Sequence, residues 1–278
     1  MKRRTATAAG MQHVAPYSRL YVLFTGMERV ASLLECVAGW AVDGAHVRLA
    51  GLAPSALLPD SDQWAAQHCA NRITLAATLE TARELLALRG IEADCEFLGA
   101  GPDNAARNEA LARAVRLWQA DLTIGAPANP VALADETASP LLMLPTPTAR
   151  HCSVPPGRVF VVSDASAASA RAVGEAARLV APGTSVRVGY LACDPAAAQH
   201  PEGFDAVILE VGHEGKSTAH AIIQAALQWR ADLLVLGTRG GHEGGGRWRY
   251  ASVAADVAQR TVLPLLLVPQ GSKTSMLA

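Results

Sequence analysis

The sequence predicts an α/β fold made of two doubly wound parallel-sheet domains in tandem. Three observations carry this prediction. Short apolar strands alternate with segments of helical periodicity, the same order of elements occurs twice, and 278 residues are enough for two domains of ordinary size. Because the strands are continuous apolar runs, we expect helices to cover both faces of each sheet.

The first half begins with a β-α-β pattern, in which an apolar strand over residues 20–24 precedes a helix over 27–42 and a strand over 46–52. The other elements expected in this half are helices over 61–89 and 103–119 and strands over 92–98, 122–125 and 140–145. Such alternation is typical of parallel sheets, whose strands need crossover connections.

The second half repeats this order. Its expected elements are strands over 158–164, 185–192, 204–211, 233–236 and 264–269, and helices over 166–180 and 253–261 with a further helix that ends at Trp229. The connection between the strands over 185–192 and 204–211 contains Pro195 and Pro201 and is too short for the long helix of the first half.

Two stretches are nearly identical in the two halves. Trp118-Gln-Ala-Asp-Leu corresponds to Trp229-Arg-Ala-Asp-Leu, and Pro140-Leu-Leu-Met-Leu-Pro145 corresponds to Pro264-Leu-Leu-Leu-Val-Pro269. A repeat this long indicates duplicated domains rather than a short-period solenoid. We therefore divide the chain into a tail (1–17), a first domain (18–147), a linker rich in proline (148–157), a second domain (158–270) and a second tail (271–278).

Composition and charge exclude several classes of protein. With 50% hydrophobic and 18% charged residues the chain is not intrinsically disordered, and a net charge of −1 gives no general support for binding nucleic acid or an anionic membrane. Five scattered cysteines form neither a disulfide framework nor a zinc site, and no histidine cluster has metal-ligand spacing. No apolar run is long enough to span a membrane. We expect a cytoplasmic protein without a metal site.

A glycine-rich loop after the strand over 233–236 is the strongest functional signal. It runs from Gly237 to Ser252, contains Arg239 and Gly240, and leads into a helix from about Val253. Glycines let backbone N–H groups approach a ligand, arginine suits phosphate, and a helix N-terminus carries unpaired N–H groups. The loop is therefore interpreted as a phosphate cradle, and a mobile surface loop is the alternative.

These segments resemble the universal stress protein family. Residues 231–240 look like the fourth strand and the start of its G-x2-G-x9-G-[S/T] nucleotide loop, residues 253–268 like its closing helix and fifth strand, and residues 161–166 like the end of its first strand. The resemblance implies flavodoxin-like domains, adenine-nucleotide binding and dimerisation through the last strand. It implies a site made by Asp164, Ala165, Gly237, Arg239, Gly240, Ala251, Ser252 and Val253.

The site departs from the family pattern at one point. Tyr250 stands where the last glycine of the pattern is expected, and one additional loop residue brings Ala251 and Ser252 into register, so that Ala251 replaces that glycine. For Asp164 two roles stay open: accepting hydrogen bonds from an adenosine, or capping the helix that begins near Ser166. Trp248 is either a cover for a bound base or an exposed loop aromatic.

The first half lacks these features. Its fourth strand is followed by Ala126-Pro127-Ala-Asn-Pro130 without a glycine cluster, and its first strand ends at Thr25 without a carboxylate. The segment Gly212–Thr218 resembles a P-loop, but Glu210 stands where that motif needs glycine, so Ser217 or Thr218 is better explained as a helix cap. A structural or regulatory role is expected for the first domain.

The expected function is stress-response sensing or regulation by binding ATP or a related adenine nucleotide, with or without Mg²⁺, in the second domain. No nucleophile or general base is identifiable, so we expect no enzyme activity, although slow ATP hydrolysis is left open. The alternative is a nucleotide-free scaffold that works through protein association. In that case strands 141–144 and 265–268 would form an internal pseudo-dimer, and a homodimer is a further possibility.

Overall fold

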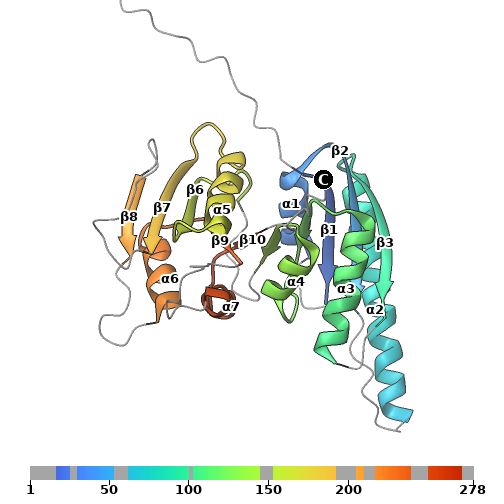
Figure 1. The fold of residues 1–278 in the computed structure, drawn as a ribbon. Coiled ribbons are helices and arrows are strands. Elements are labelled where there is room, and N and C mark those ends of the chain that lie inside the picture. Colours follow the sequence, from blue (N-terminus) through green and yellow to red (C-terminus); the bar gives the residue numbers. More distant parts are fainter. Residues whose placement is uncertain are drawn as a thin grey trace, which may run out of the picture.

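The structure is a computed structural model of the chain. It describes residues 17–25, 30–52, 62–99, 103–144, 153–191, 205–209, 217–238 and 250–270. Alternating strands and helices form the α/β fold predicted from the sequence, with one sheet running through both halves of the chain (Figure 1).

Ten strands make this sheet, in the order β3-β2-β1-β4-β5-β10-β9-β6-β7-β8. The strands are β1 (Tyr17–Phe24), β2 (Ala41–Leu52), β3 (Glu92–Leu98), β4 (Leu122–Ile124), β5 (Leu141–Met143), β6 (Arg158–Ser163), β7 (Ser185–Leu191), β8 (Asp205–Leu209), β9 (Leu233–Gly237) and β10 (Leu265–Val268). The order of the second five is the mirror of the first five, which is the arrangement that two copies related by a two-fold axis produce.

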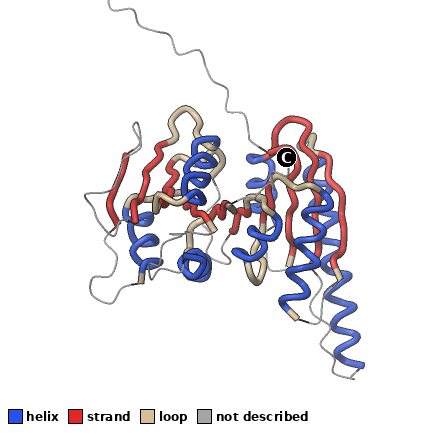
Figure 2. Tube along the Cα trace, viewed as in Figure 1, coloured by secondary structure: helices blue, strands red, loops and turns tan. Residues whose placement is uncertain are grey.

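Within the described ranges, seven helices cover the two faces of the sheet (Figure 2). The helices are α1 (Val30–Trp40), α2 (Asp62–Ala87), α3 (Asn104–Trp118), α4 (Pro130–Thr137), α5 (Ala167–Arg178), α6 (Thr218–Gln228) and α7 (Tyr250–Arg260). Buried side chains of α1, α2 and α5 join one apolar cluster, and those of α3, α4, α6 and α7 join the other. Each cluster contains residues of both halves, so the core does not stop where the halves meet.

The halves meet along their last strands. All strand pairs are parallel except β5 with β10, which run antiparallel with Leu142 directly opposite Leu266. Leu142 is 1% exposed and Leu266 is 2% exposed. Because the two strands pair with each other, neither has an unpaired apolar edge. An unpaired apolar edge strand promotes aggregation.

The repeated Trp-x-Ala-Asp-Leu stretches make equivalent hydrogen bonds in the two halves. The carboxylate of Asp121 accepts the backbone N–H of Arg19 at 2.9 Å, and that of Asp232 accepts the backbone N–H of Arg158 at 2.9 Å. Each carboxylate therefore satisfies a donor at the amino end of a central strand.

The backbone carbonyl of the tryptophan in each stretch accepts a hydrogen bond from an arginine side chain of the same central strand. Arg19 Nε donates to the carbonyl oxygen of Trp118 at 3.0 Å, and Arg158 Nη1 donates to that of Trp229 at 3.0 Å. A carbonyl at a helix C-terminus has no partner within the helix, so the arginine supplies one. The literal repeat in the sequence is thus a device that joins α3 to β1 and α6 to β6.

A second contact between the halves lies on the α1–α5 face. The Tyr17 hydroxyl donates to Glu175 Oε1 of α5 at 2.6 Å, and the Arg178 guanidinium lies 5.7 Å from the Tyr17 ring centroid. Burial, with the Glu175 carboxylate beside the hydroxyl, raises the pKa of Tyr17 well above its usual value of 10.0.

We expect this tyrosine to make the fold sensitive to alkaline pH. In the unfolded chain Tyr17 loses its proton near pH ~10, while in the folded chain it stays protonated to higher pH. The free energy of unfolding therefore falls as pH rises above about 10, and Tyr17→Phe removes this group's share of the fall. Urea unfolding at about pH 8 and about pH 10.5 measures it. An equal fall in the wild type and the variant contradicts this prediction.

One element of the first half was not expected from the sequence. Helix α4 begins at Pro130 in its first turn, and the Asn129 side chain caps it by accepting the backbone N–H of Ala132 at 3.3 Å. Proline fits the first helical position because the N–H it lacks would have had no partner there. Pro130 thus starts a helix.

Candidate ligand site at the carboxyl edge of the second half

The topology brings two of the predicted site segments to one edge of the sheet. Strands β6 and β9 are parallel neighbours, with Val161 opposite Val235, so their carboxyl ends lie at the same edge. Asp164 and Ala165 follow β6, and Gly237 is the last residue of β9. Ligands of open α/β sheets bind outside this edge.

Asp164 forms the turn between β6 and α5. Its Oδ1 accepts the backbone N–H of Ser166 at 3.0 Å, and the side chain is partly buried. Ser166 is the residue that caps α5, with its hydroxyl oxygen accepting the Ser169 N–H at 3.2 Å. The interpretation of Asp164 as the helix cap is therefore wrong, because Ser166 takes that position. A carboxylate with up to four acceptor sites keeps capacity for a ligand beyond this single bond.

Ala165 holds a backbone conformation that alanine rarely adopts. Its φ of 61° lies in the left-handed region, and its N–H donates to the Ser163 hydroxyl at 3.3 Å. Strained backbone of this kind is found more often at ligand sites than elsewhere. Ala165 is exposed, so the strain is stored at the surface of the carboxyl edge.

Gly237 is explained by packing. A Cβ added to it would lie 3.0 Å from the carbonyl carbon of Ala168 and 3.1 Å from the Ala168 Cβ and carbonyl oxygen. The end of β9 therefore approaches the first turn of α5 as closely as glycine allows. Gly237 was predicted to contact a phosphate, and in the structure it also makes this close contact with α5.

Replacing Gly237 with alanine is expected to lower the free energy of unfolding by about 1–3 kcal/mol, because the atoms that must move are helix backbone. Urea denaturation of the full chain measures the change. Gly44→Ala is a matched control for a glycine with no atom within 4 Å, although its positive φ adds a backbone cost of its own. A Gly237→Ala variant as stable as the wild type contradicts the packing role.

The residue after Gly237 joins the site to the first half. Thr238 is fully buried, its hydroxyl donates to Asp135 Oδ1 of α4, and its backbone N–H donates to the Val268 carbonyl at 3.0 Å. The start of the glycine-rich segment is thus held by both β10 and the other half of the molecule. No sequence signal indicates this contact, because the two residues lie 103 positions apart.

The other predicted residues are placed only in part. Arg239 and Gly240 lie outside the described residues, as do Trp248 and the P-loop-like residues 212–216. Helix α7 begins at Tyr250, earlier than the expected Val253, so Ala251, Ser252 and Val253 all belong to it. For Ala251 and Ser252 only the helical backbone is described. The first N–H groups of a helix have no partner within it, which suits the predicted phosphate contact.

The same edge of the first half is built differently. Strand β4 ends at Ile124 and the cap of α4 is Asn129, so only a short connection stands where the second half has residues 238–249. Ser217 caps α6 by accepting the His220 N–H at 3.3 Å, as proposed for the P-loop-like segment.

Two further searches cover only the described part of the chain. There, no three histidine, cysteine or acidic side chains gather as metal ligands would. In those same residue ranges no helix is both long and apolar enough to cross a membrane.

Comparisons with known proteins agree with this architecture. Residues 194–269 match the model of the universal stress protein family. The chain is similar to the structure of a universal stress protein from Archaeoglobus fulgidus DSM 4304, with a TM-score of 0.64 and 16% identity over 91% of this chain and 97% of that chain. It is also similar to a protein from Pseudomonas aeruginosa UCBPP-PA14 assigned as a universal stress protein, with a TM-score of 0.59 and 14% identity over 91% and 93%. No curated protein matches the sequence.

Proposed function

We propose that the second half of this chain, in which residues 194–269 match the model of the universal stress protein family, binds ATP or a related adenine nucleotide. In this proposal the protein is a cytoplasmic stress-response sensor or regulator, and it responds to binding of the nucleotide with or without Mg²⁺. The protein works through this binding and not through turnover.

The observation that carries the proposal is the meeting of Asp164 and Gly237 at one edge of the sheet. Asp164 contributes a carboxylate in the turn that precedes α5. An ionised carboxylate accepts hydrogen bonds from ribose hydroxyls or an adenine amine. The proposal adds Arg239 and Gly240, which follow Thr238 in the sequence, and Ala251, Ser252 and Val253 of the first turn of α7 as phosphate contacts.

The coupling to a response follows from the contact of Thr238 with Asp135. A ligand that orders the segment after Gly237 acts next to the Thr238–Asp135 hydrogen bond, through which the start of that segment contacts α4 of the first half. A ligand shifts a conformational equilibrium only when it binds one state better than the other. The Thr238–Asp135 contact supplies a place where the two states can differ.

A scaffold that works through protein association is the second candidate. It rests on the antiparallel pairing of β5 with β10, which closes the two half-sheets into one body without a ligand. Such a platform needs no nucleotide, so the two candidates differ in a property that can be measured directly.

The proposal is tested by titrating Asp164→Ala with ATP and magnesium beside the wild type. Hydrogen bonds to a charged group contribute about 1.5–3 kcal/mol, so the affinity is expected to fall by about tenfold or more. Thr25→Ala is the matched control, because Thr25 follows β1 as Asp164 follows β6, and it is expected to bind as the wild type does. Unchanged affinity in Asp164→Ala removes that residue from the site, and absent binding in the wild type favours the scaffold.

A further inference from the structure

The amino edge of the second half carries an open depression far from the site described above. Its volume is about 540 Å³, within the range of small-ligand pockets. The depression lies where β6, β7 and β8 begin and α6 ends, and its lining residues are Arg158, Ser185, Val186, Asp205, Gln228, Trp229 and Arg230. Nothing in the proposed nucleotide site uses this edge.

Two arginines frame the tryptophan of this depression. The guanidinium carbons of Arg158 and Arg187 lie 5.9 Å and 5.0 Å from the Trp229 ring. Arg158 is held by the Trp229 carbonyl, and Arg187 Nε donates to Asp205 Oδ2 at 2.6 Å. Two of the lining side chains, those of Arg158 and Asp205, are therefore held by hydrogen bonds.

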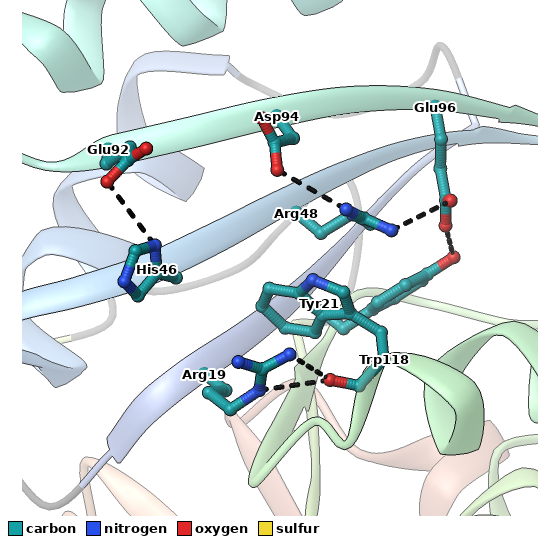
Figure 3. A network of polar contacts seen from close by, with 8 residues as sticks. All are labelled: Arg19, Tyr21, His46, Arg48, Glu92, Asp94, Glu96 and Trp118. Carbon is teal, nitrogen blue, oxygen red and sulfur yellow. Dashed lines mark hydrogen bonds and ion pairs between the residues drawn. The ribbon is translucent and has the colours of Figure 1, made fainter.

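The first half contains the same frame around Trp118. Arg19 and Arg48 lie 4.6 Å and 5.4 Å from that ring, and Arg48 forms an ion pair with Asp94 at 3.3 Å (Figure 3). The strand registers make this correspondence residue by residue. Arg48 is opposite Asp94 in the pair β2–β3, as Arg187 is opposite Asp205 in the pair β7–β8.

The two halves differ in the charged side chains around this tryptophan. In the first half Glu96 lies beside both Arg48, at 3.5 Å, and the Tyr21 hydroxyl, and Glu92 faces His46 at 3.4 Å (Figure 3). Glu96 therefore compensates the guanidinium of Arg48. A further anion there would meet repulsion.

The second half lacks this compensation at the matching positions. By the registers, Val207 stands where the first half has Glu96, and Phe160 where it has Tyr21. Arg230 takes the place of Gln119, and both residues hold the same left-handed conformation after the helix, with φ of 59° and 57°. Compared with the surroundings of Trp118, those of Trp229 therefore have one carboxylate fewer and one cation more. The carboxylate of Asp205 is already paired with Arg187.

We propose that this depression at the amino edge of the second half binds a small organic phosphate. The exposed guanidinium groups of Arg158 and Arg230 bind the phosphate oxygens, because the planar fork of arginine matches an oxyanion. Trp229 and Val186 offer apolar surface to the organic part of the ligand. The site is independent of the adenine-nucleotide proposal, since it lies at the opposite ends of the same strands.

Calorimetric titration of the full chain with phenyl phosphate tests this site, with inorganic phosphate and phenol as comparison ligands. We expect phenyl phosphate to bind best, and its affinity to fall when ionic strength is raised. Arg230→Gln restores the first-half residue and is expected to weaken binding about fivefold or more, allowing for the screening of exposed charges. Val207→Glu restores the lost carboxylate and is expected to have an effect in the same direction.

Arg89→Gln is the matched control, because Arg89 is an exposed arginine next to α2 of the first half, and it should leave the affinity unchanged. A wild type that does not bind phenyl phosphate overturns the proposal. So does a folded Arg230→Gln variant with wild-type affinity, whatever Val207→Glu does. Loss of phenyl phosphate binding in Asp164→Ala, with Arg230→Gln unaffected, would place the ligand at the carboxyl edge instead. Equal affinity for inorganic phosphate would exclude an organic ligand.

Discussion

Leu266→Ala is expected to lower the free energy of unfolding of the whole chain by about 3 kcal/mol, the middle of the range for a buried leucine. Leu266 is the second residue of β10, is 2% exposed and lies opposite Leu142 across the junction of the halves. Because each apolar cluster contains residues of both halves, we expect one unfolding transition that shifts as a whole. Urea denaturation followed by both fluorescence and circular dichroism measures the shift.

Leu88→Ala is the control for the chemistry of this substitution. Leu88 is 83% exposed, so its replacement should change stability by no more than about 0.5 kcal/mol. If Leu266→Ala instead produces two separate transitions, one of them at the wild-type position, then the halves fold independently and the shared core has no energetic consequence.

Gly125→Ala is the second change with a large expected effect, a loss of about 2–4 kcal/mol. Gly125 follows β4 with φ of 149°, a conformation that side chains rarely allow. A Cβ there would lie 2.6 Å from Leu23 Cβ in the buried middle of the sheet. Backbone strain and a clash inside the core therefore act together, and thermal or urea unfolding measures their sum.

Gly174→Ala provides the opposite outcome with the same chemical change. Gly174 lies within α5, with no atom within 4 Å of the added Cβ, so alanine should stabilise the chain by about 0.5–1 kcal/mol. A Gly125→Ala variant with stability close to that of Gly174→Ala would show that β4 and β1 can separate at little cost.

The order of strands and helices was predictable because the patterns are local. Continuous apolar strands, helix-period segments and the repeated Trp-x-Ala-Asp-Leu stretches each lie within a few residues of one another in the sequence. The role of the repeats was not predictable. It depends on Arg19 and Arg158, which contact their tryptophans from 99 and 71 positions away.

The candidate site shows the same limit. The turn at Asp164 and the glycine at the end of β9 were identified from the sequence, but their local roles were not. Ser166 rather than Asp164 caps α5, Ala165 adopts φ of 61° although it is neither glycine nor asparagine, and Gly237 is required by α5. These facts follow from how β6, β9 and α5 pack together, which a single sequence does not state.

The first half gives a further example. Pro127 and Pro130 remove backbone donors, from which we expect no phosphate loop after β4. The same proline at position 130 also begins α4, whose Asp135 contacts Thr238 of the second half. Pro130 thus argues against a phosphate loop in the sequence and begins helix α4 in the structure.

The most direct test of the account is the stoichiometry of nucleotide binding to the full chain, measured by calorimetric titration with ATP in the presence of magnesium. The account predicts a single nucleotide per chain, because only the second half has a carboxylate after its first strand and a glycine-rich segment after its fourth. It also predicts that Gly240→Trp abolishes binding in a chain that remains folded. No binding, or two nucleotides per chain, would contradict it.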